Sequence, residues 1–322
     1  LALTEGDVDY WITPLGLQRG LQGQVLAAGD LEVISNPAAG FRYLSFNTRK
    51  FPMSDTAFRQ AMACMIDKDF MANNVLQGVA ISLDSVVPPG AAYWANPDIE
   101  GWCEGQVQSE RVASAIQILK DGGWTWTTEP GWDEDNRDVI PKGEGLRGPG
   151  GESVPALTLL APGPGYDPLR ATYALFIEDW ANDLGIPVSA EPTGFNVIVD
   201  RVFGPVDWDM YILGWGVGIF PDHVTAFFET SGDSAAGGFN TPGYSNPEFD
   251  ALAAEFNAAT ELDVARDLIF EMDAIIARDV PYVVLFTTPI LEAFRNTLSF
   301  PFTDTLDGIQ NWLGTPNLVG QQ

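Results

Sequence analysis

Residues 156–213 alternate between short apolar runs and helical patterns, and this alternation limits the possible folds more than any other feature of the chain. The predicted elements are a strand at 156–161 (ALTLLA), a helix from Asp167-Pro168 to Leu184, a strand near Val188, a short helix from Phe195 and a strand at 208–213. Asp-Pro is typical of a helix start, and Gly185 is typical of a helix end. Strands that alternate with single helices lie parallel and are joined by right-handed crossovers, so we predict an α/β fold with a parallel βαβαβ core.

Less regular patterns surround this core. Further strands are predicted at 31–35, 42–47 and 282–286, and further helices after an N-cap at Ser54, at 109–121, from Asn246-Pro247 and from Thr260. Residues 124–153 are rich in Trp, Gly, Pro and acids without a sustained period, which predicts a surface excursion. An irregular tail is expected after residue 286.

The charge balance excludes several classes of function. The 322 residues include 16 Lys and Arg against 44 Asp and Glu, so the formal net charge is −28. Such a chain repels phosphate backbones and anionic lipid head groups, which argues against nucleic-acid and membrane-surface partners. The sequence contains no apolar run of the roughly 18 residues that a membrane span needs. Its opening, LALTEGDVDYW, lacks the pattern of a secretory leader, so we expect a processed or truncated chain.

Metal ions and cofactors find little support in the sequence. His223 is the only histidine and fits a polar residue near a helix start. Asp133, Asp135 and Glu144 fall on a calcium-loop template, but Asp138 stands where that loop requires glycine. Two cysteines cannot form a zinc framework, and spacing alone leaves open whether Cys64 and Cys103 form a disulfide. We therefore expect no cofactor and no metal.

The best candidate site follows the strand at 208–213, because ligands of open α/β sheets bind at the carboxyl ends of the strands. The segment reads Gly214-Trp215-Gly216-Val217-Gly218-Ile219-Phe220-Pro221-Asp222. Its glycines let a ligand approach the backbone, and Trp215 offers a flat face for stacking. The alternative is that Trp215 is a core residue and that the glycines only turn the chain. Motifs of hydrolases, metalloproteases and nucleotide-binding enzymes are absent from the sequence.

Several segments, in order along the chain, resemble family 5 of the bacterial solute-binding proteins, the dipeptide-, oligopeptide- and nickel-binding proteins of ABC importers. They are GDVDYWITPL (6–15), FRYLSFNTRKFPMSDTAFRQAMACMIDKDF (41–70), Val-Pro-Pro-Gly (87–90), LKDGGW (119–124), DMYILGWG (209–216) and GYSNPEFDAL (243–252). The resemblance implies a two-lobed binding protein that closes on its ligand, with a periplasmic-binding-protein-like lobe of the type II, cluster C kind and hinge-domain strands. It implies a hinge-side remnant of the first lobe at 1–47, a ligand-gripping second lobe at 48–288 and a return segment at 289–322.

The resemblance also implies ligand-binding positions. The family's Gly-Trp loop falls on Gly214, Trp215 and Gly216. The other implied or candidate positions are Phe195, Gly218, Phe220, Asp222, Asn47 and Tyr43. Peptide-binding members place an Asp where this chain has Gly218, and a buried ammonium group without a partner is costly. A neutral oligosaccharide, another polar organic solute or a differently anchored peptide is then as good a candidate as a peptide with a free amino group.

By this resemblance the protein is expected to be an extracytoplasmic, lipid-anchored or secreted monomer that delivers its ligand to an ABC permease, and not an enzyme. Two alternatives remain open from the sequence. The same lobe fits a ligand sensor that docks to a membrane receptor. A secreted hydrolase that uses paired carboxylates is the third possibility, although no spacing of acids supports it.

Overall fold

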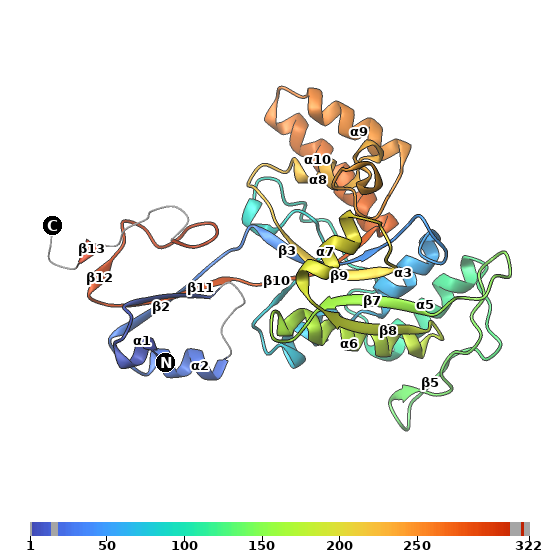
Figure 1. Ribbon diagram of the computed structural model, residues 1–322, viewed down its shortest axis with the longest axis horizontal. Coiled ribbons are helices and arrows are strands. Elements are labelled where there is room, and N and C mark those ends of the chain that lie inside the picture. The colour runs from blue at the N-terminus through green and yellow to red at the C-terminus, as the bar shows by residue number, and fades with distance from the viewer. Residues whose placement is uncertain (1, 14–18, 310–316, 319–322) are drawn as a thin grey trace.

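The computed structural model describes residues 2–13, 19–309 and 317–318, and a six-stranded mixed sheet forms the centre of the larger part of the molecule (Figure 1). In spatial order its strands are β4 (Ile81–Ser82), β10 (Tyr282–Thr287), β3 (Gly40–Phe46), β9 (Met210–Gly216), β7 (Leu157–Pro162) and β8 (Val188–Thr193). Strand β7 runs parallel to both β8 and β9, whereas β3 is antiparallel to β9 and β10. The predicted α/β class is confirmed.

The predicted βαβαβ unit is present as β7, α6 (Pro168–Asp183), β8, α7 (Phe195–Phe203) and β9. Helix α6 starts where the sequence indicates, because the Asp167 carboxylate accepts hydrogen bonds from the backbone N–H groups of Leu169 and Arg170, both at 3.0 Å. The predicted end of the last strand is wrong. Strand β9 continues to Gly216, because β3 pairs with it as far as Gly40.

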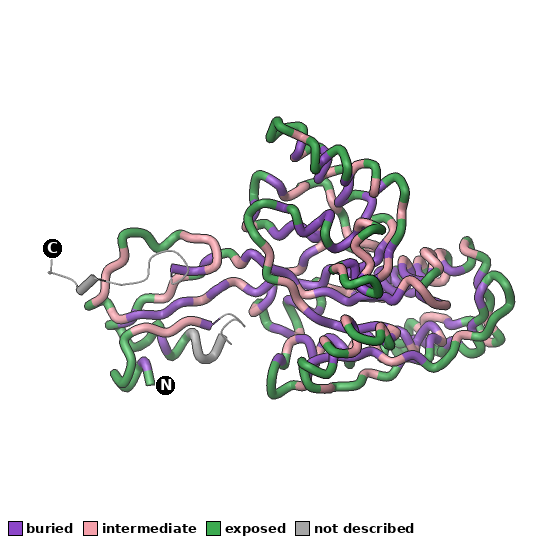
Figure 2. Tube along the Cα trace, turned by 45° about the horizontal axis from the view of Figure 1, so that its top comes forward, coloured by how far each residue is buried: buried purple, intermediate pink, exposed green. Residues whose placement is uncertain are grey.

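Helices cover both faces of the sheet. One face packs against α3 (Thr56–Met65), α5 (Gln108–Asp121) and α6, with Phe58, Leu119 and Tyr173 fully enclosed. The other face packs against α7, α8 (His223–Phe228), α9 (Pro247–Ala258) and α10 (Leu262–Asp279). Figure 2 shows the strands as the most continuously buried segments. The alternation of side chains along each strand therefore divides the apolar core into two clusters, one on either side of the sheet.

A second sheet extends to one side of the first (Figure 1). It consists of β1 (Tyr10–Thr13), β11 (Ile290–Arg295) and β2 (Leu31–Asn36), all antiparallel, and lies beside α1 (Ala2–Glu5) and α2 (Arg19–Leu26). A short pair, β12 (Leu298–Ser299) and β13 (Asn317–Leu318), follows. The expectation of an irregular tail after residue 286 is thus wrong for 290–295, because β11 is the central strand of this sheet.

Two chain segments connect the sheets, at 36–40 and 287–290. The Thr287 hydroxyl donates a hydrogen bond to the Gly40 carbonyl oxygen at 2.8 Å and joins them. Strand β3 belongs to the six-stranded sheet, which therefore begins at residue 40. The expected division of the chain into lobes at 47 and 48 stays a prediction.

Two local expectations are also settled. Asp55, not Ser54, caps α3, because its carboxylate accepts from the Phe58 N–H at 3.0 Å. Residues 124–153 contain the expected irregular excursion with a hairpin of β5 (Trp132–Asp133) and β6 (Asp138–Val139), yet Trp124 and Leu146 are buried within it. The remaining short elements are α4 (Lys68–Phe70), a π-helical turn at Met71–Val75 and 3-10 turns at Pro89–Ala91, Thr230–Gly232 and Ser234–Ala236.

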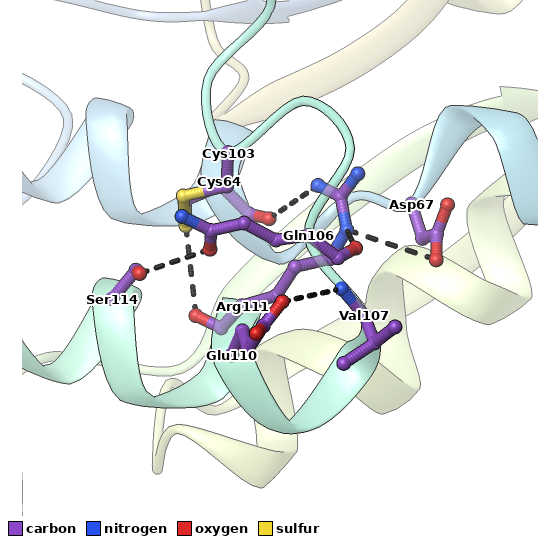
Figure 3. Close-up of a disulfide and its surroundings, with 8 residues drawn as sticks. All are labelled: Cys64, Asp67, Cys103, Gln106, Val107, Glu110, Arg111 and Ser114. Atoms are coloured by element: carbon purple, nitrogen blue, oxygen red, sulfur yellow. Dashed lines mark hydrogen bonds and ion pairs between the residues drawn. A yellow bond between two sulfur atoms is a disulfide. The ribbon is translucent and has the colours of Figure 1, made fainter.

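Cys64 and Cys103 form a disulfide with their Cα atoms 5.0 Å apart, which settles the question that their spacing left open. It fastens the loop before α5 to the end of α3 (Figure 3). Arg111 of α5 donates to the Cys64 carbonyl oxygen at 2.9 Å and to the Gln106 carbonyl oxygen at 3.1 Å. Helix α3, the loop and α5 are therefore held together around one covalent bond.

In the part of the chain that the structure describes, no helix has the length and hydropathy of a membrane span. No cluster of three or more His, Cys, Asp or Glu side chains suited to a metal ion is found within those residues either.

Candidate functional site

A pocket of about 310 Å³ lies where the parallel strands end and the two sheets meet. Tyr166 follows β7, Phe195 follows β8, and Gly216 ends β9, so each strand of the βαβαβ unit contributes at its carboxyl end. The full lining is Ala38, Ala39, Gly40, Arg42, Tyr166, Arg170, Phe195, Gly214, Trp215, Gly216, Ile290 and Asp307. The topology therefore places the pocket at the edge where ligands of such sheets bind.

Two aromatic rings form one wall of the pocket. Tyr166 and Phe195 stack with ring centroids 5.4 Å apart and planes 24° apart, and both are exposed. The guanidinium of Arg170 lies 5.7 Å from the Tyr166 ring centroid, within the range of a cation–π contact. Phe195 is the first residue of α7, and this position holds its ring at the mouth of the pocket. The wall offers a flat apolar surface to a ligand.

Two arginines bring positive charge to the pocket. Arg170 is buried, and its Nε lies 2.6 Å from Oδ2 of the equally buried Asp167, so this charge is compensated within the protein. Arg42 reaches the pocket from β3, and burial lowers the pKa of its guanidinium although the nearby Asp167 opposes that shift. Among the described residues, none forms an ion pair or a side-chain hydrogen bond with the guanidinium of Arg42.

The opposite wall comes from the segments that join the two sheets. Asp307 accepts a hydrogen bond from the Ala39 N–H at 2.5 Å, and its own N–H donates to the Pro37 carbonyl oxygen at 2.9 Å. The Asn36 side chain accepts from the Thr305 N–H at 3.0 Å. The segment 305–309 therefore braces the connection at 36–40 and places the Asp307 carboxylate in the pocket wall.

Trp215 lines the pocket, but its indole does not stand free. Its ring stacks on Phe227 with centroids 4.5 Å apart, runs parallel to the Tyr43 ring at 6.3 Å, and has Phe203 and Phe239 at its edges. This arrangement matches the alternative expectation, in which Trp215 is a core residue. Trp215 is nevertheless only partly buried, so the predicted role of the indole as a stacking face for ligand stays a prediction.

The structure brings together four of the nine residues expected at the site: Gly214, Trp215, Gly216 and Phe195. Tyr43 is enclosed in the core, with its hydroxyl 3.3 Å from that of Tyr211. Asn47 is also enclosed and donates to the Trp208 carbonyl oxygen at 2.9 Å. These two side chains face the protein interior, and this is a correction of their expected place at the cleft.

Gly218, Phe220 and Asp222 lie outside the pocket lining. Phe220 packs on Phe256 with centroids 5.7 Å apart, and Asp222 precedes α8. His223 begins α8, as the sequence indicates, and burial lowers its pKa. The continuation of β9 explains the displacement, because a strand that runs to Gly216 carries the following residues past the pocket.

Sequence reasoning missed Arg42, Tyr166, Arg170 and Asp307. A signal for Arg42 existed, because it lies in the predicted strand at 42–47 and successive strand residues point to opposite faces. Tyr166 and Arg170 flank the helix start at Asp167, which the sequence marks clearly. No local sequence pattern predicts the position of Asp307 in the pocket, because this position depends on the return of the chain to the second sheet.

Comparison with known families decides the wider relationship. The model of the bacterial extracellular solute-binding proteins, family 5 middle region, matches residues 1–238. The chain belongs to this family. The name of the family describes solute binding.

Individual relatives in the family are distant. The oligopeptide-binding protein OppA of Bacillus subtilis (strain 168) is 23% identical over 282 residues, which are 87% of this chain and 46% of that protein. The solved structure of AppA from Bacillus subtilis in complex with a nonapeptide has a TM-score of 0.71 at 20% identity and covers 94% of this chain and 54% of its own. The structure of DppA from Helicobacter pylori in complex with the peptide STSA has a TM-score of 0.71 at 19% identity. The match covers 95% of this chain and 52% of DppA. The chain spans about half the length of these proteins, and the likeness supports the fold.

Proposed function

We propose that this chain is a ligand-binding lobe, with adjoining hinge strands, of an extracytoplasmic solute-binding protein that delivers its ligand to an ABC permease. One observation carries the proposal: the pocket collects residues from the ends of all three parallel strands and is closed on its other side by the segments that connect the two sheets. A ligand there contacts both parts of the molecule, so its binding favours one arrangement of the two parts over others.

The ligand we propose is a peptide or a similar organic solute. OppA and AppA are oligopeptide-binding proteins, and the structures of AppA and DppA that share this fold contain bound peptides. Oligosaccharides have less support, because the indole expected to stack on a sugar ring is packed against Phe227. The peptide's free ammonium group is not the proposed anchor, since neither Gly218 nor Asp222 lies in the pocket lining.

Native mass spectrometry of the intact protein that contains this chain tests the proposal. Gently purified protein should carry a co-purified small molecule that is lost on denaturation. The variant Phe195→Ala should lose it, because the aromatic wall is removed, whereas Phe220→Ala should retain it, because that exposed ring lies outside the pocket. The proposal predicts that identified ligands also bind in calorimetry. Equal retention by both variants would show that the ligand binds elsewhere.

The proposed protein acts as a monomer, anchored by lipid or secreted, and performs no chemistry on its ligand. A transport experiment distinguishes this function from that of a sensor that docks to a receptor. Uptake of the identified ligand should stop when the gene is deleted and should return when the wild-type gene is restored. A deletion strain that still imports the ligand at the normal rate would contradict the permease partnership.

A further inference from the structure

Arg42 reaches the pocket through a specific local arrangement. Strand alternation turns its side chain to the face opposite Phe41 and Tyr43, and β3 pairs it with Gly214 of β9. A Cβ atom at Gly214 would lie 3.1 Å from Cδ of Arg42 and 3.1 Å from the Phe41 carbonyl oxygen. The arginine stem therefore lies across the glycine, and this glycine leaves room for it.

Among the residues that the structure describes, no charged group forms an ion pair with Arg42. Of the described residues that line the pocket, the charged ones are Arg42, Arg170 and Asp307. Arg170 is bound to Asp167, and Asp307 is engaged by the Ala39 N–H. Burial lowers the pKa of Arg42, with Arg170 adding to this effect and Asp167 opposing it. Arg42 is partly buried, and Asp167 offsets only part of the effect of that burial. A partly buried guanidinium without an ion-pair partner destabilises the folded protein, and a negatively charged ligand group would remove this cost.

We propose that Arg42 binds a carboxylate group of the ligand, in the pocket between the Tyr166–Phe195 wall and the junction of the two sheets. This inference rests on the proposed function and names the chemistry of its ligand. A guanidinium presents two parallel N–H donors that match the two oxygens of a carboxylate, and it keeps its charge when partly buried. The Arg170–Asp167 pair fixes the neighbouring wall, so the approaching carboxylate meets one free positive charge.

Peptides with a blocked amino group test the contact between Arg42 and the carboxylate alone, because they carry no ammonium group. The probes are N-acetylated tripeptides supplied as an equimolar library, once with free carboxylates and once as the matching carboxamides. Both sets are titrated by native mass spectrometry and calorimetry against the intact wild type and the variants Arg42→Gln and Arg42→Lys. Arg201→Gln is the control, because Arg201 is a partly exposed arginine outside the lining, and its Nη1 lies 3.8 Å from Oε2 of Glu191.

The wild type should favour the free acids over the carboxamides by on the order of 100-fold, the usual effect of a desolvated charge pair. Arg42→Gln should abolish this preference by weakening the acids, with the carboxamides unchanged. Arg42→Lys should keep part of the preference, because the charge remains without the planar fork. Arg201→Gln should behave as the wild type.

Three results would overturn the assignment. If acids and carboxamides bind the wild type equally, the ligand's carboxylate does not meet Arg42, although the solute-binding function stands. If Arg42→Gln weakens both sets equally, Arg42 supports the pocket structurally and has no role in charge recognition. If the wild type binds neither set, the proposed peptide ligand fails, and the inference that depends on it fails with it.

Discussion

The indole of Trp215 stacks on the ring of Phe227, with centroids 4.5 Å apart and planes 22° apart. Tyr211 and Leu213 precede Trp215 at alternate positions and lie in the same apolar cluster, whereas Gly214 faces Arg42. Gly214 and Trp215 therefore lie on opposite faces of strand β9. The tryptophan strengthens the core, and the glycine opens the pocket.

We expect Trp215→Ala to lower stability more than ligand affinity. The truncation removes a large ring from an aromatic cluster, and its cost in the free energy of unfolding should be about 3 kcal/mol. Urea unfolding measures this loss, and calorimetry with the co-purified ligand measures the affinity of the folded fraction. An unchanged stability with a lost affinity would mean that the indole contacts the ligand directly.

Gly214→Ala and Gly218→Ala form a matched pair. A methyl group at 214 meets Arg42 and the Phe41 carbonyl oxygen at 3.1 Å, so it should displace the arginine and cost about 1–2 kcal/mol of stability. A methyl group at 218 meets only backbone atoms of Phe220, the nearest at 3.7 Å, and should change stability by less than about 0.5 kcal/mol. The acid-over-amide preference should fall in the first variant alone. Similar effects in both would contradict the proposed path of the Arg42 side chain.

Reduction of the disulfide should destabilise the fold. Cys64 and Cys103 are 39 residues apart, and a loop of this length restricts the unfolded chain by about 4 kcal/mol in the chain-entropy model. Urea unfolding with and without a thiol reductant measures the difference. The double variant Cys64→Ala, Cys103→Ala should be less stable and insensitive to the reductant. A wild-type midpoint that does not move after complete reduction would contradict this expectation.

Asp273 should make stability fall as the pH rises from about 4 to 6. Burial raises the pKa of its carboxyl to about 6, although the Ser85 hydroxyl donates to it at 2.6 Å. Between the unfolded pKa of about 3.9 and this value the folded state binds one proton more than the unfolded state, so stability falls as the pH rises through this range. Above about pH 6 both states are ionised, and Asp273 changes stability no further. Relative to Asp273→Asn, the wild type should lose on the order of 2 kcal/mol between pH 4 and pH 7.5.

Urea unfolding of both proteins at several pH values gives this difference and cancels the titration of groups common to both. His223 acts in the opposite direction, since burial lowers its pKa, and its Nε2 lies 3.0 Å from the Val86 carbonyl oxygen. A stability difference between wild type and variant that is constant with pH would show that Asp273 does not titrate in this range.

The βαβαβ part of the fold could be predicted from the sequence, because the patterns that mark its strands and helices involve only neighbouring residues. The Asp167-Pro168 helix start and the apolar run at 156–161 each depend on neighbouring residues, and both are found at their expected places. Strand β11 was missed, because 290–295 owes its structure to pairing with β1 and β2 from the other end of the chain. Sequence patterns do not contain such distant partners.

The site was accessible only in part for the same reason. Phe195 and the Gly-Trp residues follow strand ends, so topology alone leads to them. Tyr43 was expected at the site, but its neighbour Arg42 lines the pocket, because adjacent residues of a strand point to opposite faces. Asp307 enters the pocket only because the Ala39 N–H holds it there.

The pairing of β3 with β9 and β10 sets an order of events for biosynthesis. Strand β3 occupies residues 40–46, but its two neighbours in the sheet come at 210–216 and 282–287. A ribosome that makes this chain therefore releases β3 long before either neighbour exists, and both of its hydrogen-bonding edges stay open through most of translation. Pairings between such distant segments are slow to form and expose edges that other chains can join. The lobe should consequently depend on chaperones during synthesis more than its compact final sheet would indicate.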